Sequence, residues 1–232
     1  MLSILGFGFL MGMRHAIEAD HVAAMASLTT RAGSVRRAVP LGLSWGAGHT
    51  LMLAAFGLAA MVLGSALPAE LAVYLERAVG VMLIALGGDV LVRLVRERVH
   101  FHPHRHDGVV HWHAHSHAGE KVHDPERHHH EHASGGSLRA FLVGIMHGMA
   151  GSAALVVLAL QSMPSVATGV LYIVVFGIGS MLGMAALTAV VAWPMSLAER
   201  TLGWLHGGAR AGVGALTIGL GGAILFAGAL PF

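Results

Sequence analysis

The sequence predicts an all-α integral membrane protein, in which six transmembrane helices form a 3+3 inverted repeat around a disordered, histidine-rich cytoplasmic loop. Its 232 residues are 55% hydrophobic and 11% charged, and their mean hydropathy is +0.69. A soluble domain of this length needs far more charge to cover its surface. Six apolar runs reach the roughly 20 residues that cross a bilayer, and the two halves of the chain align with each other. These three observations favour the predicted fold class.

The six apolar runs lie near residues 2–28, 40–65, 72–95, 138–161, 165–192 and 209–230. No basic region precedes the first run, so we interpret it as a retained helix and not as a signal peptide. This run is also longer than a straight span requires, and polar residues interrupt it between His15 and His21. We therefore expect a tilt, a kink or local unwinding at that point.

Positive charges are distributed unequally between the two ends of the spans. Counted between the runs, twelve Lys and Arg residues lie on one side, whereas Arg77 alone lies on the side shared by both termini. Cytoplasmic loops carry the excess of positive charge. Both termini should therefore be outside and the central loop cytoplasmic, in a multi-pass protein of the cell membrane.

The central loop spans residues 96–137, between a first three-helix repeat at 1–95 and a second at 138–232. Thirteen of the eighteen histidines fall in this loop. Many imidazoles within reach of one another chelate divalent ions near neutral pH, so we interpret the loop as a disordered metal-binding tract. A solvated low-complexity linker and an internal affinity tag are the alternatives.

The predicted repeat rests on an alignment of the two halves at an offset of 132 residues. Phe9–His15 then matches Phe141–His147 at Phe, Leu, Gly and His, and a small drift of the offset matches Trp45–His49 with Phe176–Ser180. An odd number of spans per repeat inserts the second copy upside down, as in many secondary transporters, whose ion sites lie near the repeat interface. His15 and His147, the histidines of the two first helices, should lie near that interface. An alternative is that His147 is only a relic of the duplication and is hydrogen-bonded in the core.

Ionisable side chains inside the first apolar run indicate a functional site. His15, Glu18, Asp20 and His21 lie within this run, and one charge at membrane depth costs at least about 2.5 to 3.5 kcal/mol. A polar network that only ties helices together is the alternative, but a hydrogen bond in a membrane averages about 0.6 kcal/mol. That gain is too small to offset four ionisable groups, so we expect an ion or proton site.

The chain has no cysteine, so any metal must be bound by imidazole, carboxylate or backbone oxygen. That ligand set suits nickel, cobalt, zinc and iron(II). On a regular helix His15, Glu18 and His21 share one face, and Asp20 falls outside it. Either the helix is distorted, or Asp20 orients an imidazole by accepting its free N–H. The candidate metal ligands, in order of preference, are His15, Asp20, His21, His49, Glu18 and His147.

The segment His15–His21, preceded by Leu10–Arg14, resembles the HxxxxDH signature of the nickel/cobalt transporter (NiCoT) superfamily and its UreH-like relatives. Trp45–Thr50 resembles the GHS/T element that this family carries in the following helix. Typical NiCoT permeases have eight spans and an LGxDTxTE-type element, where this chain has the uncharged Gly148–Ser152. The chain is therefore more similar to the shorter UreH-like branch.

The resemblance implies a secondary transporter, not an enzyme, that moves Ni²⁺, with Co²⁺ as a second cargo, across the cytoplasmic membrane. It implies no bound cofactor, and the expected partners are the divalent metal ion, the lipid bilayer and cytoplasmic nickel chaperones. With a net charge of +2 and no basic-aromatic module, no nucleic acid is expected.

The direction of transport and the class of protein each leave a competing hypothesis. The membrane potential favours import of a cation, and nickel or cobalt efflux is the main competing direction. An intramembrane metalloenzyme is less favoured, because the sequence contains no HExxH motif. A metal-delivery partner for urease or hydrogenase assembly is a third hypothesis.

Overall fold

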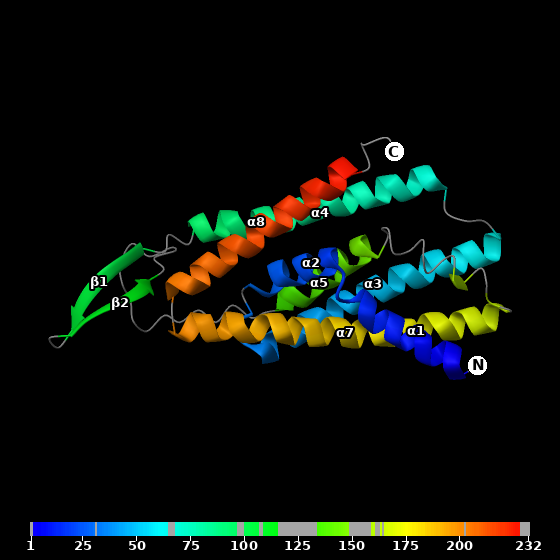
Figure 1. Ribbon diagram of the computed structural model, residues 1–232, viewed down its shortest axis with the longest axis horizontal. Helices are drawn as coiled ribbons and strands as arrows, with labels where there is room; N and C mark the ends of the chain where they lie inside the picture. The colour runs from blue at the N-terminus through cyan, green and yellow to red at the C-terminus, as the bar shows by residue number, and fades with distance from the viewer. Residues whose placement is uncertain are drawn as a thin grey trace.

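A computed structural model describes residues 2–30, 32–64, 68–96, 100–106, 109–115, 134–148, 159–160, 163, 165–201 and 203–227. The described chain is predominantly helical, as predicted, with one β-hairpin at an end of the molecule (Figure 1). Its elements are α1 Leu2–His15, α2 Ala19–Thr29, α3 Val35–Leu63, α4 Ala69–Arg96, β1 His100–His106, β2 Val109–His115, α5 Ser134–His147, α7 Val166–Thr201 and α8 Gly203–Ala227.

Four helices in the described part of the chain are long and apolar enough to cross a membrane. They contain the segments Val35–Leu63, Glu70–Arg96, Val166–Ala198 and Leu205–Ala227, and so correspond to four of the six predicted spans. The first predicted span is divided into the shorter helices α1 and α2. The fourth begins in α5, and its residues 149–158 lie outside the described residues.

The break between α1 and α2 confirms the predicted interruption of the first span. The last turn of α1 tightens, because the amides of Ile17 and Glu18 bond to carbonyls three residues back, at 3.1 Å each. Glu18 then adopts an extended conformation, with φ −64° and ψ 149°, and its carbonyl accepts the first bond of α2 from Val22. Asp20 follows in the first turn of α2, where a negative charge is favourable to the helix dipole.

The helices pack mainly in four pairs, α4 with α8, α3 with α7, α1 with α7 and α3 with α5. Glycine allows the backbones to approach closely. A Cβ on Gly12 would lie 2.1 Å from the carbonyl oxygen of Phe176, and a Cβ on Gly144 would lie 2.0 Å from that of Trp45. Neither position tolerates a side chain, as is common where helices pack in membranes. These contacts bring the end of α1 and the end of α5 towards the middle of the bundle.

Helix α2 lies between the α4/α8 pair and the other helices (Figure 1). Thr217 of α8 fastens it in place. The hydroxyl of Thr217 lies 3.0 Å from that of Ser27 and 3.3 Å from the carbonyl oxygen of Ala23, and both hydroxyl-bearing side chains are buried. These contacts fix the position of α2, and therefore of its polar first turn, inside an apolar bundle.

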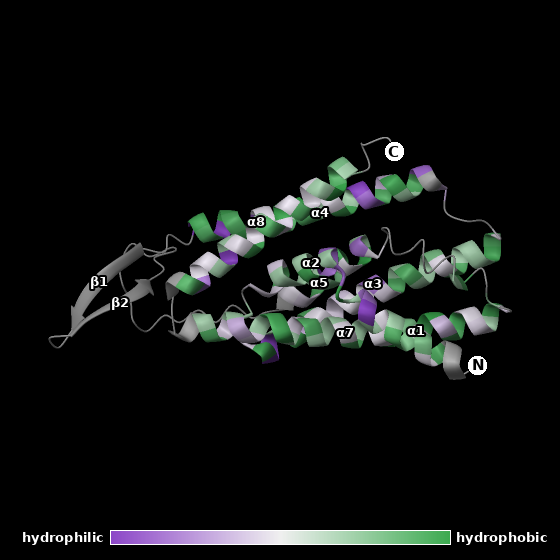
Figure 2. Ribbon diagram, viewed as in Figure 1, coloured by the Kyte–Doolittle hydropathy of each residue, from purple (hydrophilic) through white to green (hydrophobic). Residues whose placement is uncertain are grey.

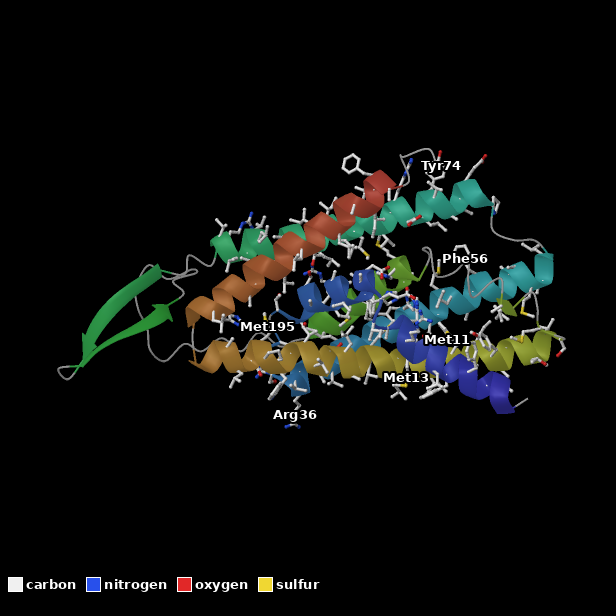
Figure 3. All side chains as sticks on the ribbon, in the orientation of Figure 1. Met11, Met13, Arg36, Phe56, Tyr74 and Met195 are labelled. Atoms are coloured by element: carbon white, nitrogen blue, oxygen red, sulfur yellow. The ribbon has the colours of Figure 1, made fainter. Side chains whose placement is uncertain are left out.

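The outer surface of the helices is apolar. Figure 2 shows them mainly in the hydrophobic colours, with a hydrophilic segment where α1 meets α2. Large apolar side chains are exposed around the bundle, among them Val62, Val190 and Leu216. Figure 3 shows Tyr74 pointing outward from α4 and Arg36 pointing outward from the start of α3. Such a surface requires an apolar solvent, and it is that of a multi-pass membrane protein.

Two segments of the histidine-rich loop, residues 100–106 and 109–115, are among the described residues. These residues form antiparallel strands, whose register pairs His100 with His115, His102 with His113 and His104 with His111. The sequence contained the signal, because histidine recurs at every second position over 100–106 and 111–115, on either side of the Asp-Gly dipeptide at 107–108. Histidine count and polarity concealed that period of two. The remainder of the loop, at 116–133, lies outside the described residues.

Candidate metal centre

All six predicted site residues come together in the middle of the helical bundle. The break between α1 and α2 supplies four of them, α3 supplies the fifth and the last residue of α5 supplies the sixth. In that order they are His15, Glu18, Asp20 and His21, then His49, then His147. The ring centroid of His21 lies 4.3 Å from that of His15, 5.0 Å from that of His49 and 4.4 Å from that of His147. The structure therefore places His21 centrally, and the role of the six as metal ligands stays a prediction.

The four imidazoles are buried and the two carboxylates are not. The histidines expose 0 to 5% of their surface, whereas Asp20 exposes 27% and Glu18 47%. An isolated carboxylate or imidazolium is costly to desolvate, so ionised groups stay near the open edge of the site. The interior consists of side chains that can be neutral and still bind a cation.

His15 is held between a carboxylate and a second imidazole. Its Nδ1 lies 3.0 Å from Glu18 Oε1, and its Nε2 lies 3.0 Å from His49 Nε2. An ionised carboxylate only accepts hydrogen bonds, so His15 donates its Nδ1–H to Glu18. In the neutral ring Nε2 then has the lone pair, and it accepts the Nε2–H of His49. The free lone pair of His49 is at Nδ1.

Asp20 joins two other histidines. Its Oδ1 lies 2.9 Å from His21 Nδ1, and its Oδ2 lies 3.0 Å from His147 Nε2. By the same reasoning both histidines donate to the ionised carboxylate and keep lone pairs at His21 Nε2 and His147 Nδ1. The sequence left two possibilities for Asp20, a distorted helix or a carboxylate that orients an imidazole. The structure has both features, because the helix is broken before Asp20 and its carboxylate accepts the N–H of His21. His147 is indeed hydrogen-bonded in the core, but its partner belongs to the site.

Three imidazole nitrogens in the site lack a hydrogen-bond partner among the described residues: His21 Nε2, His49 Nδ1 and His147 Nδ1. They are the atoms to which the hydrogen-bond pattern assigns free lone pairs. A buried acceptor without a partner is unfavourable. Each of these atoms is therefore suited to accept a proton or bind a metal ion.

In the part of the chain that the structure describes, two groups of three residues have the spacing of metal ligands. They are His15, His21 and His49, all buried, and Asp20, His21 and His147. Within each group one possible ligand atom per residue lies within 4.8 Å of the others. Metal–ligand bonds of about 2.0 to 2.2 Å separate neighbouring ligand atoms by about 3 Å or slightly more. The hydrogen-bonded pairs in the site already have that separation.

Sequence reasoning missed two aromatic residues that contact the imidazoles. The ring of Phe176 lies 5.6 Å from that of His15, and the other residue is Trp45. It is fully buried, stacks on His49 with ring centroids 5.8 Å apart, and meets the rings of His21 and His147 edge-on at 5.1 and 5.2 Å. Its position four residues before His49 on α3 puts both on one helix face, which is a signal that could have identified it. Trp45 forms an apolar wall that restricts three of the four imidazoles.

Comparison with known proteins covers most of the chain. The chain is 31% identical over 202 residues to the urease accessory protein UreH of Bacillus sp. (strain TB-90), an alignment of 87% of this chain and 82% of that protein. No protein-family model matches the chain. No solved structure matches it either.

Proposed function

The chain belongs to the family of the urease accessory protein UreH, and from this membership and the buried histidine site we propose that it transports divalent nickel, with cobalt as a second cargo, across the cell membrane. The membership confirms the resemblance to the UreH-like branch. The observation that carries the proposal is the set of four buried imidazoles, three of them oriented by Glu18 and Asp20. Imidazole with carboxylate is a ligand set that suits both ions.

The position of the site supports transport over a purely structural role. It lies where one helix of an apolar bundle is interrupted, and discontinuous helices commonly bind ions in secondary transporters. Glu18 and Asp20 each accept the N–H of a neighbouring imidazole, which turns the other ring nitrogen towards the interior. A hydrated cation can thus exchange water for preoriented nitrogen ligands.

Import is the proposed direction. A divalent ion entering the cell gains about 4.6 kcal/mol per 100 mV of membrane potential, twice the value for a single charge. Ligands must be deprotonated to bind the ion, so protons compete with the cargo at the same nitrogens. Efflux would have to work against the potential and would need a coupled ion.

Reciprocal helix contacts support the proposal that residues 1–95 and 138–232 are inverted repeats. Gly12 approaches the carbonyl of Phe176, and Gly144 approaches the carbonyl of Trp45. Gly144 lies 132 residues after Gly12, and Phe176 lies 131 residues after Trp45, so the two contacts are equivalent under the predicted repeat. Each first helix thus packs on the second helix of the other half. In the third helices, a Cβ on Gly80 would lie 2.8 Å from the carbonyl of Gly221, and the reverse distance is 2.5 Å. A two-fold axis that relates the two halves of the chain would produce such reciprocal contacts.

We also propose that both termini are outside and that the histidine-rich tract lies in the cytoplasm, where it binds the delivered metal. The positive charges support this orientation. In the hairpin, three histidine pairs occupy successive cross-strand register positions separated by two residues. The register thus brings six histidine positions opposite one another in three pairs. Cytoplasmic nickel chaperones are the proposed recipients.

Uptake of radioactive nickel into sealed proteoliposomes tests the proposed function. Wild type should accumulate nickel, and His21→Ala should lose uptake because His21 belongs to both ligand groups. Equal uptake by both proteins would refute the site. Metal-dependent turnover in detergent without flux would favour an enzyme. In cells, nickel content should rise with expression, whereas a fall would establish efflux.

A further inference from the structure

We infer that the transported ion uses two overlapping positions that share His21: a buried position at His15, His21 and His49, and a partly exposed position at Asp20, His21 and His147. The ion passes from one to the other by exchanging ligands around His21. This inference rests on the proposed function and adds to it a division of labour among the ligands.

The separation of the histidines supports two positions over one four-histidine site. The rings of His49 and His147 are 5.9 Å apart between centroids, whereas those rings lie 5.0 and 4.4 Å from His21. Trp45 contacts the rings of His49 and His147 and lies edge-on to the ring of His21. His49 and His147 thus belong to different ligand groups, and only His21 belongs to both.

The two positions differ in their access to the surroundings. All three residues of the first group are buried, at 5%, 0% and 0% exposure. In the second group Asp20 is 27% exposed. A carboxylate is also the harder ligand, and it tolerates waters beside it. The second position therefore suits an ion that still has part of its hydration shell, and the first position suits a dehydrated ion.

The two positions also draw on different helices. The buried position joins α1, α2 and α3, whereas the other joins α2 to α5 through His147. Helix α5 lies against α3 because Gly148 and Gly144 approach the carbonyls of His49 and Trp45. An ion that changes position keeps His21 as a ligand throughout. Stepwise exchange avoids leaving a bare cation in a low-dielectric interior, so His21 acts as the pivot.

Binding and transport should therefore separate between His49 and His147. The parent for the test is the full chain with its thirteen loop histidines replaced by glutamine, so that only the central site reports. Equilibrium dialysis and the absorption bands of bound Co²⁺ measure binding in detergent, and Ni²⁺ flux is measured in proteoliposomes. His147→Asn is used because asparagine keeps an N–H that can donate to Asp20. Ser180→Ala, a buried polar change on α7, is the control for folding.

We expect His49→Ala to weaken Co²⁺ binding at least about tenfold, which corresponds to about 1.4 kcal/mol. We expect His147→Asn to weaken Co²⁺ binding less than His49→Ala does, but to lose at least about tenfold in flux. Equal weakening of binding by both variants would establish a single four-histidine site and overturn the inference. Parental flux in His147→Asn would reduce His147 to a hydrogen-bond donor and also overturn it. If the parent itself neither binds nor transports either metal, the proposed function fails, which is a distinguishable result.

Discussion

The carboxylate of Asp20 accepts a hydrogen bond from His147, a residue 127 positions later in the chain, with 3.0 Å between Oδ2 and Nε2. This contact joins the interrupted first helix to the last residue of α5. It is the most direct link between the two halves of the molecule at the site. Substitutions at this contact, and at the features that hold it in place, should therefore change metal binding or stability.

Asp20→Asn should weaken nickel binding about 10- to 100-fold, the usual effect of losing a group that orients a metal-binding imidazole. Asparagine has one acceptor oxygen where the carboxylate has two, so it cannot accept from both His21 and His147. Dialysis against Ni²⁺ measures the affinity, with Ser180→Ala as the control. Wild-type affinity in Asp20→Asn would show that orientation by Asp20 is not needed.

Glu18→Gln and Glu18→Ala should differ in their effect. The glutamine carbonyl can still accept the N–H of His15, as Glu18 does at 3.0 Å, whereas alanine leaves that N–H without the partner. A buried donor that loses its partner costs about 1 to 3 kcal/mol, so we expect weaker nickel binding in the alanine variant. Competition with a fluorescent metal chelator resolves the difference. Equal affinities in the two variants would mean that the charge of Glu18, and not its hydrogen bond, is what matters.

Gly144→Val should destabilise the protein and displace His147. A Cβ at Gly144 would lie 2.0 Å from the carbonyl oxygen of Trp45, so α5 must move away from α3. Overpacking of this kind typically costs about 1 to 3 kcal/mol. Gly222→Ala on α8 is the matched control, because nothing lies within 4 Å of its Cβ position. Thermal unfolding in detergent should separate the two variants, and equal midpoints would contradict the packing argument.

Two double variants of the hairpin distinguish histidines held in cross-strand register from a flexible tract. Removing His104 and His111 leaves two adjacent histidine pairs, whereas removing His102 and His113 leaves two pairs that are four residues apart along the strand. Four imidazoles on adjacent pairs can share an ion, so the first variant should bind Ni²⁺ more tightly. Both are compared by calorimetry in a His21→Ala chain. A flexible tract, in which only the number of histidines counts, would bind equally in both.

Cysteine labelling tests the proposed orientation, since the chain contains no cysteine of its own. Ser34 lies just before α3 at the end of the bundle that has the hairpin, and Ser165 lies just before α7 at the opposite end (Figure 1). In intact cells, a membrane-impermeant maleimide should label Ser165→Cys and not Ser34→Cys. Permeabilised cells provide the control in which both react. The reverse pattern would place the histidine-rich tract outside.

Apolar composition, run length and the interruption of the first span were sufficient to predict a helical membrane protein with four of its spans and a broken first helix. These three features are local properties of the chain, because each depends only on neighbouring residues. Comparison with the thickness of the bilayer then identifies the spans. The six site residues could also be named in advance, because ionisable groups are conspicuous in apolar runs. The hairpin was missed, because its alternation was concealed by its histidine content.

The partners of those residues were decided by the tertiary structure alone. His15 meets His49 because α1 and α3 both pack on α7, and Asp20 meets His147 because α5 packs on α3 and α2 also contacts α3. Trp45 enters the site by the same packing. No helical period encodes such contacts, since they arise from the complementary surfaces of different helices. Local sequence therefore determined which groups are available for a metal ion, and helix packing determined which of them can bind it together.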